Sequence, residues 1–278
     1  MGIYEVQLSV IITHHRDVEH LRKCLKALKE EIAGIDSEMI VVLSEYQPDM
    51  LDNFRQDFSG VKFLPFEKNL YFVRSVNRGL EQAKGDFIMI INDDVVVSKG
   101  PVALMLDFLK NNPAVGLVGP RILYPEGSKQ STCFRFYRPI TVVCRRTILG
   151  KISFCKKINE EFLYQDKNLN EILEVDWLMN GAGVLTRKEC LEKVGLLDER
   201  FQHYFSDVDW SRRFWQNGYK VIYFPKTFFF HYHGKKSGKG GIMSLFTNKL
   251  ARIHLKDGIK YFLKWGFKSD TDTRTTPG

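Results

Sequence analysis

Hydrophobic runs of strand length alternate with helically periodic segments through the first hundred residues. Two segments, beginning near residues 18 and 72, repeat apolar residues at the spacing of one helix face. The runs around them are rich in branched apolar residues and cover residues 7–13, 38–43, 61–66 and 86–91. Continuous apolar strands that alternate with helices are typical of a parallel sheet buried on both faces. The pattern therefore predicts an α/β fold.

The regular alternation ends after residue 100. The later pattern predicts a helix at 101–112, a strand and hairpin at 114–128, a strand and short helix at 175–195, a helix at 206–219, two strand-like pieces at 220–234 and an amphipathic helix or pair at 242–265. Residues 131–170 are basic and apolar and favour no assignment. Because no repeat and no Ser/Gly-rich linker interrupts the chain, we expect one continuous domain with a variable second half.

Composition and charge narrow the partners. The chain has 278 residues, 44% of them hydrophobic and 27% charged, as in ordinary globular proteins. Its net charge of +8 suits nucleic acid, an anionic membrane surface or a phosphate-bearing substrate. The basic residues concentrate at 144–157 and 233–241 without interleaved aromatic residues, so we expect no nucleic-acid partner. No apolar run approaches the roughly 20 residues of a membrane span, which leaves surface contact as the expected form of any membrane association.

The cysteines and the N-terminus bear on the compartment. Five cysteines are present, an odd number, and no two have the CxxC spacing. This predicts neither a disulfide framework nor a zinc site, and it favours a reducing cytoplasm. The first residues lack the basic-then-apolar pattern of a signal peptide.

Asn92-Asp93-Asp94 follows the apolar run at 86–91, at the carboxyl end of a predicted central strand. Ligands of open α/β sheets bind at this edge. Adjacent carboxylates repel each other unless a cation or a proton intervenes, and Mg²⁺ or Mn²⁺ takes such oxygen ligands together with substrate phosphates. The alternative is that Asp93 and Asp94 only end a strand and cap a turn, and this pattern alone leaves both interpretations open.

A second acidic candidate stands at the start of the predicted helix at 206–219. Asp207 could project into the crevice as a general base. The alternative is structural, because Ser206 followed by Asp209 resembles a capping box at a helix N-terminus. From spacing alone, the structural alternative is favoured.

Two further segments offer ligand contacts. His231 and His233 alternate on one face of a predicted strand and could reach a common metal ion, or they could be surface histidines. The glycines of "NGAG" (180–183) could let the backbone approach a ligand closely, or they could serve a tight turn.

Taken together, these segments resemble those of a known family from about residue 8 to about residue 237. "LSVIITHHR" resembles its opening strand and turn, and "NLYFVRSVNRGLEQAKGDFIMIINDDVVV" resembles its Asn-Leu-Gly-Phe, Asn-Arg-Gly and DxD block. The stretch "VDWLMNGAGVLTRKECLEKVGLLDERFQHYFSDVDWSRRFWQNGYKVIYFP", which leads to "HYHG", resembles its acceptor block. The family is that of the GT-A-fold glycosyltransferases of family 2, especially the bacterial rhamnosyltransferase-like members.

The resemblance implies a role for each matching position. Asp94 matches the second carboxylate of DxD and would bind a metal ion, and His231, or else His233, matches a later metal-binding histidine. Asp207 matches the catalytic base. Nucleotide-sugar contacts are implied for Thr13, His15, Ser44, Glu45, Asn77, Asn92, Asp93 and Asp94. Contacts to the sugar or the acceptor are implied for Trp177, Gly181 and Ala182.

Three departures from the family pattern matter. Leu43 stands where the family usually has an aspartate that contacts the nucleobase, and Glu45 is the expected substitute. Ser206 replaces an acidic residue that commonly precedes the base. The Gln-x-x-Arg-Trp signature of processive enzymes is missing, so we expect the addition of one or a few sugars.

The resemblance also implies an architecture and a reaction. It implies a GT-A fold whose mostly parallel central sheet is flanked by helices. Residues 1–240 would form the catalytic domain, with a nucleotide-sugar half (about 1–120) and an acceptor half (about 121–240), followed by a helical extension and polar tail at 241–278. The reaction would be an inverting transfer, dependent on Mn²⁺ or Mg²⁺, from a nucleotide-diphosphate sugar, dTDP-rhamnose first, to a hydroxyl of a cell-surface glycan or lipid-linked acceptor.

Alternatives remain open for the cellular location and for the class of protein. The expected place is the cytoplasm, and the basic segments are either a patch that contacts the inner face of the cytoplasmic membrane or an ordinary solvated surface. A sugar-phosphate nucleotidyltransferase is an alternative class, although "THHRDVEHL" lacks the glycine-rich first loop expected of one. An inactive nucleotide-sugar binding module is the other alternative.

Overall fold

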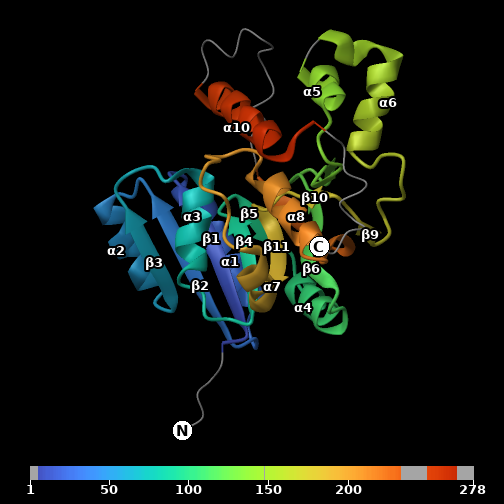
Figure 1. The fold of residues 1–278 in the computed structure, drawn as a ribbon. Helices are drawn as coiled ribbons and strands as arrows, with labels where there is room; N and C mark the ends of the chain where they lie inside the picture. The colour runs from blue at the N-terminus through green and yellow to red at the C-terminus, as the bar shows by residue number, and fades with distance from the viewer. Residues whose placement is uncertain (1–5, 147, 233–248, 268–278) are drawn as a thin grey trace.

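The fold is one large sheet with helices on both faces. Figure 1 shows the computed structural model, which describes residues 6–146, 148–232 and 249–267. The strands of the large sheet are β1 (Leu8–His15), β2 (Ser37–Ser44), β3 (Val61–Phe66), β4 (Phe87–Asn92), β5 (Val95–Val97), β6 (Val115–Leu123), β7 (Lys129–Gln130), β9 (Leu173–Glu174), β11 (Ala182–Arg187) and β12 (Lys220–His231). A small separate sheet pairs β8 (Cys133–Phe134) with β10 (Trp177–Leu178).

The helices follow the strands in the order that a layered α/β fold requires. They are α1 (Val18–Glu31), α2 (Pro48–Asp57), α3 (Tyr71–Leu80), α4 (Pro101–Asn111), α5 (Pro139–Arg146), the 3-10 helix η1 (Ile148–Lys151), α6 (Ser153–Phe162), α7 (Lys188–Val194), α8 (Ser206–Gln216) and α10 (Lys249–Trp265).

The sheet is mostly parallel. Its main path runs β3-β2-β1-β4-β11-β6-β12-β5. The first four strands are parallel to one another, and β12 is parallel to β6. Strand β11 lies antiparallel between β4 and β6. The predicted fold class is confirmed, and strands from both sides of residue 120 share the sheet.

Alternate residues of the strands build two cores. In β1, Val10 and Ile12 pack with apolar residues of α1, α2 and α4, whereas Ile11 packs with those of α3, α7 and α8. All three side chains are fully buried. The continuous apolar runs of the first half therefore arise because each strand faces a helical layer on both sides.

Three parts of the chain differ from the predicted elements. Helix α2 was not predicted, because it buries only Leu51 and Phe54 and so lacks a continuous apolar stripe. Residues 220–231, predicted as two strand-like pieces, form one strand, β12. Its register against β6 shifts between Phe224 and Phe228. Of the segment predicted at 242–265, the part before Lys249 lies outside the described residues.

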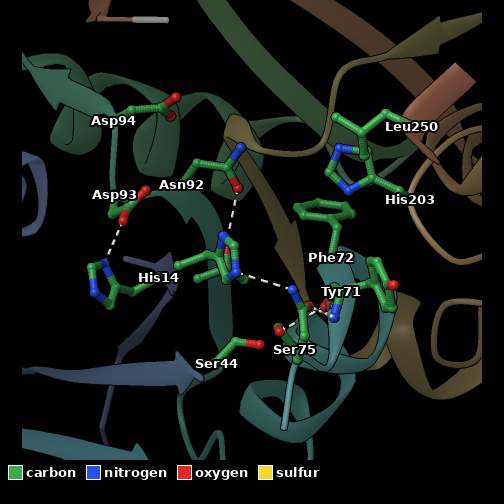
Figure 2. A pocket seen from close by; sticks show the side chains of 13 residues that line it. His14, Ser44, Tyr71, Phe72, Ser75, Asn92, Asp93, Asp94, His203 and Leu250 are labelled. Carbon is green, nitrogen blue, oxygen red and sulfur yellow. Dashed lines mark hydrogen bonds and ion pairs between the residues drawn. The ribbon is translucent and has the colours of Figure 1, made fainter. Parts of the chain in front are cut away.

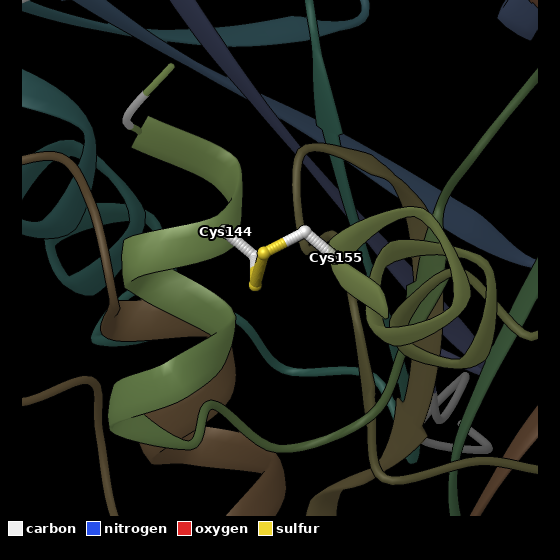
Figure 3. The surroundings of a disulfide bond; sticks show 2 residues. All are labelled: Cys144 and Cys155. Carbon is white, nitrogen blue, oxygen red and sulfur yellow. A yellow bond between two sulfur atoms is a disulfide. The ribbon is translucent and has the colours of Figure 1, made fainter. Parts of the chain in front are cut away.

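The segment at 131–170 contains a helical pair held by a disulfide. Figure 3 shows the bond between Cys144 of α5 and Cys155 of α6. Both residues are buried, and they form a small cluster with Ile158. The prediction of no disulfide was wrong, because the turn between two packed helices brings together cysteines that have no recognisable spacing. The cysteine pattern therefore gives no support for a reducing compartment.

The described residues contain no candidate for a membrane-spanning helix. None of their helices is both long and apolar enough to span a bilayer.

Candidate active site

Three parallel strands end at the same edge of the sheet. Strand β1 carries Thr13 and His15 near its end, β2 ends at Ser44 and β4 ends at Asn92. The register sets Thr13 beside Asn92 and His15 beside Ser44. Because ligands of open α/β sheets bind at the carboxyl ends of parallel strands, a site is expected here.

A pocket of about 290 Å³ opens at this edge (Figure 2). Six of the residues predicted to contact the nucleotide sugar line it: Thr13, His15, Ser44, Asn92, Asp93 and Asp94. The other lining residues are His14, Asn69, Tyr71, Phe72, Ser75, His203 and Leu250. The strand ends therefore provide a polar wall, whereas α3, the loop before α8 and α10 provide an aromatic and apolar wall.

Glu45 orients polar groups at one side of the pocket without lining it. Its Oε2 lies 2.6 Å from His15 Nε2 and accepts a hydrogen bond from Asn69 Nδ2 at 3.3 Å. The hydrogen bond with His15 lowers the pKa of Glu45, and the charge of Arg16 adds to this effect. The carboxylate therefore helps to fix the position of the His15 ring at the pocket wall.

Asp93 pairs with His14, a pocket residue that the sequence prediction missed. His14 Nδ1 lies 2.5 Å from Asp93 Oδ2, and the His14 ring is buried. Burial raises the pKa of Asp93, and the hydrogen bond with His14 acts in the opposite direction. Figure 2 shows the contact that joins Asp93 to His14. Asp94 is therefore the carboxylate that the turn leaves for another partner.

Asp94 meets His231 across the sheet. His231 Nε2 lies 3.3 Å from Asp94 Oδ1, and β12 pairs His231 with Val95 of β5. The backbone N–H of Tyr232 also donates to the carbonyl of Asp94 at 2.8 Å. The structure thus brings together two of the predicted metal ligands, which come from distant parts of the chain. The third, His233, lies outside the described residues.

The Asp94 and His231 pair fits a metal ion that shares its coordination with substrate. His231 Nδ1 lies 2.9 Å from Gln130 Oε1, which directs Nε2 towards Asp94. Within the described ranges, no three His, Cys, Asp or Glu side chains form a metal cluster. One carboxylate and one imidazole would leave coordination positions for phosphate oxygens and water. This ligand set suits Mn²⁺ better than Mg²⁺, because Mg²⁺ prefers oxygen ligands to the nitrogen of an imidazole.

The start of α8 does not have the capping box that Ser206 and Asp209 suggested. Phe205 occupies the N-cap position with a φ of 62°, and it supplies no side-chain cap. Ser206 is already the first helical residue. The capping-box interpretation is therefore wrong, and Asp209 instead accepts a hydrogen bond from the Trp265 indole at 2.8 Å.

Asp207 has the acid–base property expected of a general base. Burial raises the pKa of Asp207 to about 7, and the contact with the Asn180 backbone acts in the opposite direction. A carboxyl group with this pKa exchanges protons near neutral pH, where a catalytic base is most efficient. Its contact with Asn180 also places Asp207 beside the "NGAG" turn.

Gly181 links this turn to the pocket. Its carbonyl accepts the backbone N–H of Asn92 at 2.9 Å. A Cβ atom at Gly181 would lie 2.4 Å from Asn92 Nδ2, so a larger residue here would displace the Asn92 side chain. On its other side, Asn92 Oδ1 accepts a hydrogen bond from Thr13 at 2.7 Å. Asn92 therefore stands between the strand-end wall and the segment that contacts Asp207.

Three other predicted contact residues lie away from the pocket wall. The Trp177 indole donates to the carbonyl of Arg135 at 2.8 Å, and Ala182 is buried in β11. The side-chain amide of Asn77 exchanges two hydrogen bonds with the backbone of Leu197, at 2.9 and 3.0 Å. In this structure, these residues connect elements around the site.

The sequence matches one protein family over most of its length. A model of the family described as "Glycosyl transferase family 2" matches residues 9–194. The chain belongs to this family. The rhamnosyltransferase-like resemblance is confirmed as well, because an N-acetylglucosaminyl-diphospho-decaprenol L-rhamnosyltransferase of Mycobacterium tuberculosis is 27% identical over 199 residues, which are 66% of this chain and 62% of that protein.

The name of a second relative of this family 2 chain specifies another sugar, mannose. A dolichol-phosphate mannosyltransferase of Pyrococcus furiosus is 25% identical over 178 residues, which are 62% of this chain and 49% of that protein. The chain thus spans less than two thirds of the length of either relative.

Solved structures identify the fold as GT-A. GalNAc-T7 with UDP, GalNAc and Mn²⁺ matches 94% of this chain and 48% of its own, with a TM-score of 0.66 and 16% identity. A mannosyltransferase from Pyrobaculum calidifontis in complex with GDP-Man and Mn²⁺ matches 85% of this chain and 59% of its own, with a TM-score of 0.54 and 16% identity.

In this family 2 chain, α10 fixes the loop that leads into α8. The buried Asp257 Oδ2 accepts three backbone N–H groups at 3.1 Å each, those of Gln202, His203 and Tyr204. Leu250, from the first turn of α10, also lines the pocket. The sequence prediction missed these residues, because a lone aspartate in a lysine-rich helix resembles a surface charge.

Proposed function

We propose that this protein is an inverting, metal-dependent glycosyltransferase that moves a sugar from a nucleotide-diphosphate donor to an acceptor hydroxyl. One observation carries the proposal: Asp94 and His231 meet 3.3 Å apart at one side of the strand-end pocket. Asp207, whose pKa burial raises to about 7, contacts the Asn180 backbone, next to Gly181, whose carbonyl binds Asn92 of the pocket wall. The family membership and the GT-A fold support the same reaction class.

Asp94 and His231 would hold the metal ion, and Gln130 would keep the imidazole in the tautomer that presents Nε2. When bound, Mn²⁺ or Mg²⁺ supplies Lewis acidity that stabilises the charge of a departing nucleoside diphosphate. Thr13, His15 and Ser44 line the pocket where the nucleoside of the donor would lie.

Asp207 would act as the general base. Its carboxylate accepts the proton of the acceptor hydroxyl as the hydroxyl oxygen bonds to the anomeric carbon. The bond from that carbon to the diphosphate oxygen breaks on the opposite face, so the configuration inverts. Asn92, fixed by Thr13 and Gly181, would orient the donor between the two groups.

The named relatives support a donor and an acceptor to test. The rhamnosyltransferase of M. tuberculosis supports dTDP-rhamnose as the first donor to test. Its name specifies an acceptor carried on a diphospho-decaprenol lipid. We therefore propose a hydroxyl of a lipid-linked or cell-surface glycan as the acceptor, reached at the inner face of the cytoplasmic membrane.

Two helical segments would form the membrane-contacting face. On α10, Leu255, Ile259 and Leu263 recur at four-residue spacing and are 51%, 53% and 79% exposed. Ile152 and Phe154, in the α5–α6 segment, are 53% and 65% exposed. Figure 1 shows both segments at the same end of the molecule, and lysines and arginines flank both sets. Exposed apolar residues among basic ones are typical of binding to an anionic lipid surface.

The double variant Ile259→Ser/Leu263→Ser is expected to weaken sedimentation with phosphatidylglycerol-containing vesicles about ten-fold or more, because two side chains no longer enter the lipid. Leu104→Ser is the matched control, since Leu104 lies on α4 and is 52% exposed. It should sediment like the unchanged protein. Equal sedimentation of all three proteins, or none of the unchanged protein, would exclude this membrane face.

A nucleotide-sugar hydrolysis screen tests the proposed reaction class. With Mn²⁺ or Mg²⁺ present, we expect release of nucleoside diphosphate from dTDP-rhamnose or a UDP- or GDP-linked sugar, and no release after chelation of the metal. Pyrophosphate formed from a sugar phosphate and a nucleoside triphosphate would identify a nucleotidyltransferase instead. Binding of nucleotide without turnover or metal dependence would identify an inactive module.

A further inference from the structure

Tyr71 stands in a backbone conformation that an aromatic residue rarely adopts. Its φ is +57°, in the left-handed region that favours glycine. The resembled Asn-Leu-Gly-Phe pattern has glycine at this place, and this chain has Asn69-Leu70-Tyr71-Phe72. A bulky residue here raises the free energy of the folded state, and such strain concentrates at ligand-binding sites.

The turn that carries Tyr71 is fixed by the strand-end wall. The backbone N–H of Leu70 donates to Ser44 Oγ at 2.8 Å, and that of Tyr71 donates to Asn69 Oδ1 at 2.8 Å. The amide of Asn69 in turn contacts Glu45. The same groups that bound one end of the pocket therefore set the position of the Tyr71 ring.

The ring contributes to the pocket and not to a core. Tyr71 lines the pocket beside Phe72, whereas it belongs to neither of the two large apolar clusters. Lys249 Nζ lies 5.5 Å from the centre of the ring, at the start of α10. The Tyr71 residue is half-buried and forms part of the pocket wall.

We propose that Tyr71 binds the nucleoside of the donor by stacking on its base, an inference that rests on the proposed function. Under the proposed function, Asp94 and His231 bind the diphosphate with the metal, and the sugar faces the side of Asn92 and Gly181 that leads to Asp207. Figure 2 shows Tyr71 and Asp94 on opposite sides of the pocket, with Asn92 between them. The end that remains for the base is the one formed by Ser44, Asn69 and Tyr71. The flat face of an aromatic ring can stack on any nucleobase.

Titration calorimetry with dTMP and UMP, without added metal, tests this role separately from the metal site. We expect Tyr71→Gly to weaken binding of its preferred nucleotide about ten-fold, with a melting temperature that is unchanged or raised because glycine accepts the positive φ. Tyr71→Phe is the matched control and should bind within about two-fold of the unchanged protein, because it keeps the ring face. In turnover assays, Tyr71→Gly should raise KM for the donor with kcat unchanged, since the nucleoside does not change in the reaction.

Two results would overturn the inference while leaving the proposed function intact. One is that Tyr71→Gly binds both nucleotides as tightly as the unchanged protein. The other is that the melting temperature of Tyr71→Gly falls by several degrees, which would make the ring a packing residue. If the unchanged protein neither binds a nucleotide nor hydrolyses a nucleotide sugar, the proposed function and this inference fail together.

Discussion

Asp207→Asn is expected to lower turnover about a hundred- to ten-thousand-fold while the protein still binds the nucleotide-sugar donor. The amide keeps the size of the side chain but cannot accept the proton of the acceptor hydroxyl. Stopped assays of sugar transfer, together with calorimetric titration of donor in the presence of Mn²⁺, measure the two effects separately. Unchanged turnover would remove Asp207 from the role of base.

The pH dependence of the unchanged protein checks the same residue. Because burial raises the pKa of Asp207 to about 7, kcat should rise as the pH passes through that value and the carboxylate forms.

The effect of Asp207 on the stability of the fold has the opposite dependence on pH. The folded state holds the proton more tightly than the unfolded state, so this residue lowers stability as the pH rises from about 4 to about 7. Asp207→Asn should therefore melt at least as high as the unchanged protein at pH 8, where Asp207 carries its charge.

Asp209→Asn is a matched comparison on the same helix. Asp209 is fully buried, and it contacts Arg213 on α8 and both Lys264 and Trp265 of α10. Loss of this charge removes a fully buried carboxylate that binds two partly buried cations, so the expected result is a lower melting temperature. Of these two variants, only Asp207→Asn is expected to lower turnover without lowering the melting temperature.

Asp94→Ala and His231→Ala are each expected to abolish metal-dependent donor binding and to lower turnover about a hundred-fold or more, because the departing diphosphate loses its stabilising cation. Titration of a nucleoside diphosphate with and without Mn²⁺ measures the effect. The metal should tighten binding by the unchanged protein and leave both variants unaffected.

Asp107→Ala controls for the removal of one carboxylate, because Asp107 is an exposed residue of α4. It should show the full response to Mn²⁺. If Mn²⁺ tightened nucleotide binding equally in Asp94→Ala, the metal would have to be bound elsewhere in the chain.

The apolar run at 86–91 predicted that Asn92, Asp93 and Asp94 lie at the carboxyl end of a central strand, whereas Thr13, His15 and Ser44 were named through the family resemblance. Thr13, Ser44 and Asn92 all lie at the ends of strands whose parallel order follows from their alternation with helices. The pairing of Asp94 with His231 was anticipated only through the family resemblance. The strand order that joins β5 to β12 is a long-range property that no local pattern contains.

The residues that were missed act through partners far away in the chain. His14 looks like a polar interruption at the end of β1 until Asp93 is placed beside it. Asp257 looks like a surface charge until α10 packs on the loop before α8. Tyr71 has an ordinary identity, and only its backbone conformation distinguishes it. These positions depend on tertiary packing, which overrides what spacing and composition indicate.

A crystal of this protein grown with Mn²⁺ and dTDP or UDP, whichever binds, gives the most direct measurement of the central claim, through the anomalous scattering of manganese. The account predicts a peak within coordination distance of both His231 Nε2 and an Asp94 carboxylate oxygen, with diphosphate oxygens completing the coordination. A manganese peak away from these two side chains, beside a nucleoside diphosphate bound in the same pocket, would contradict it.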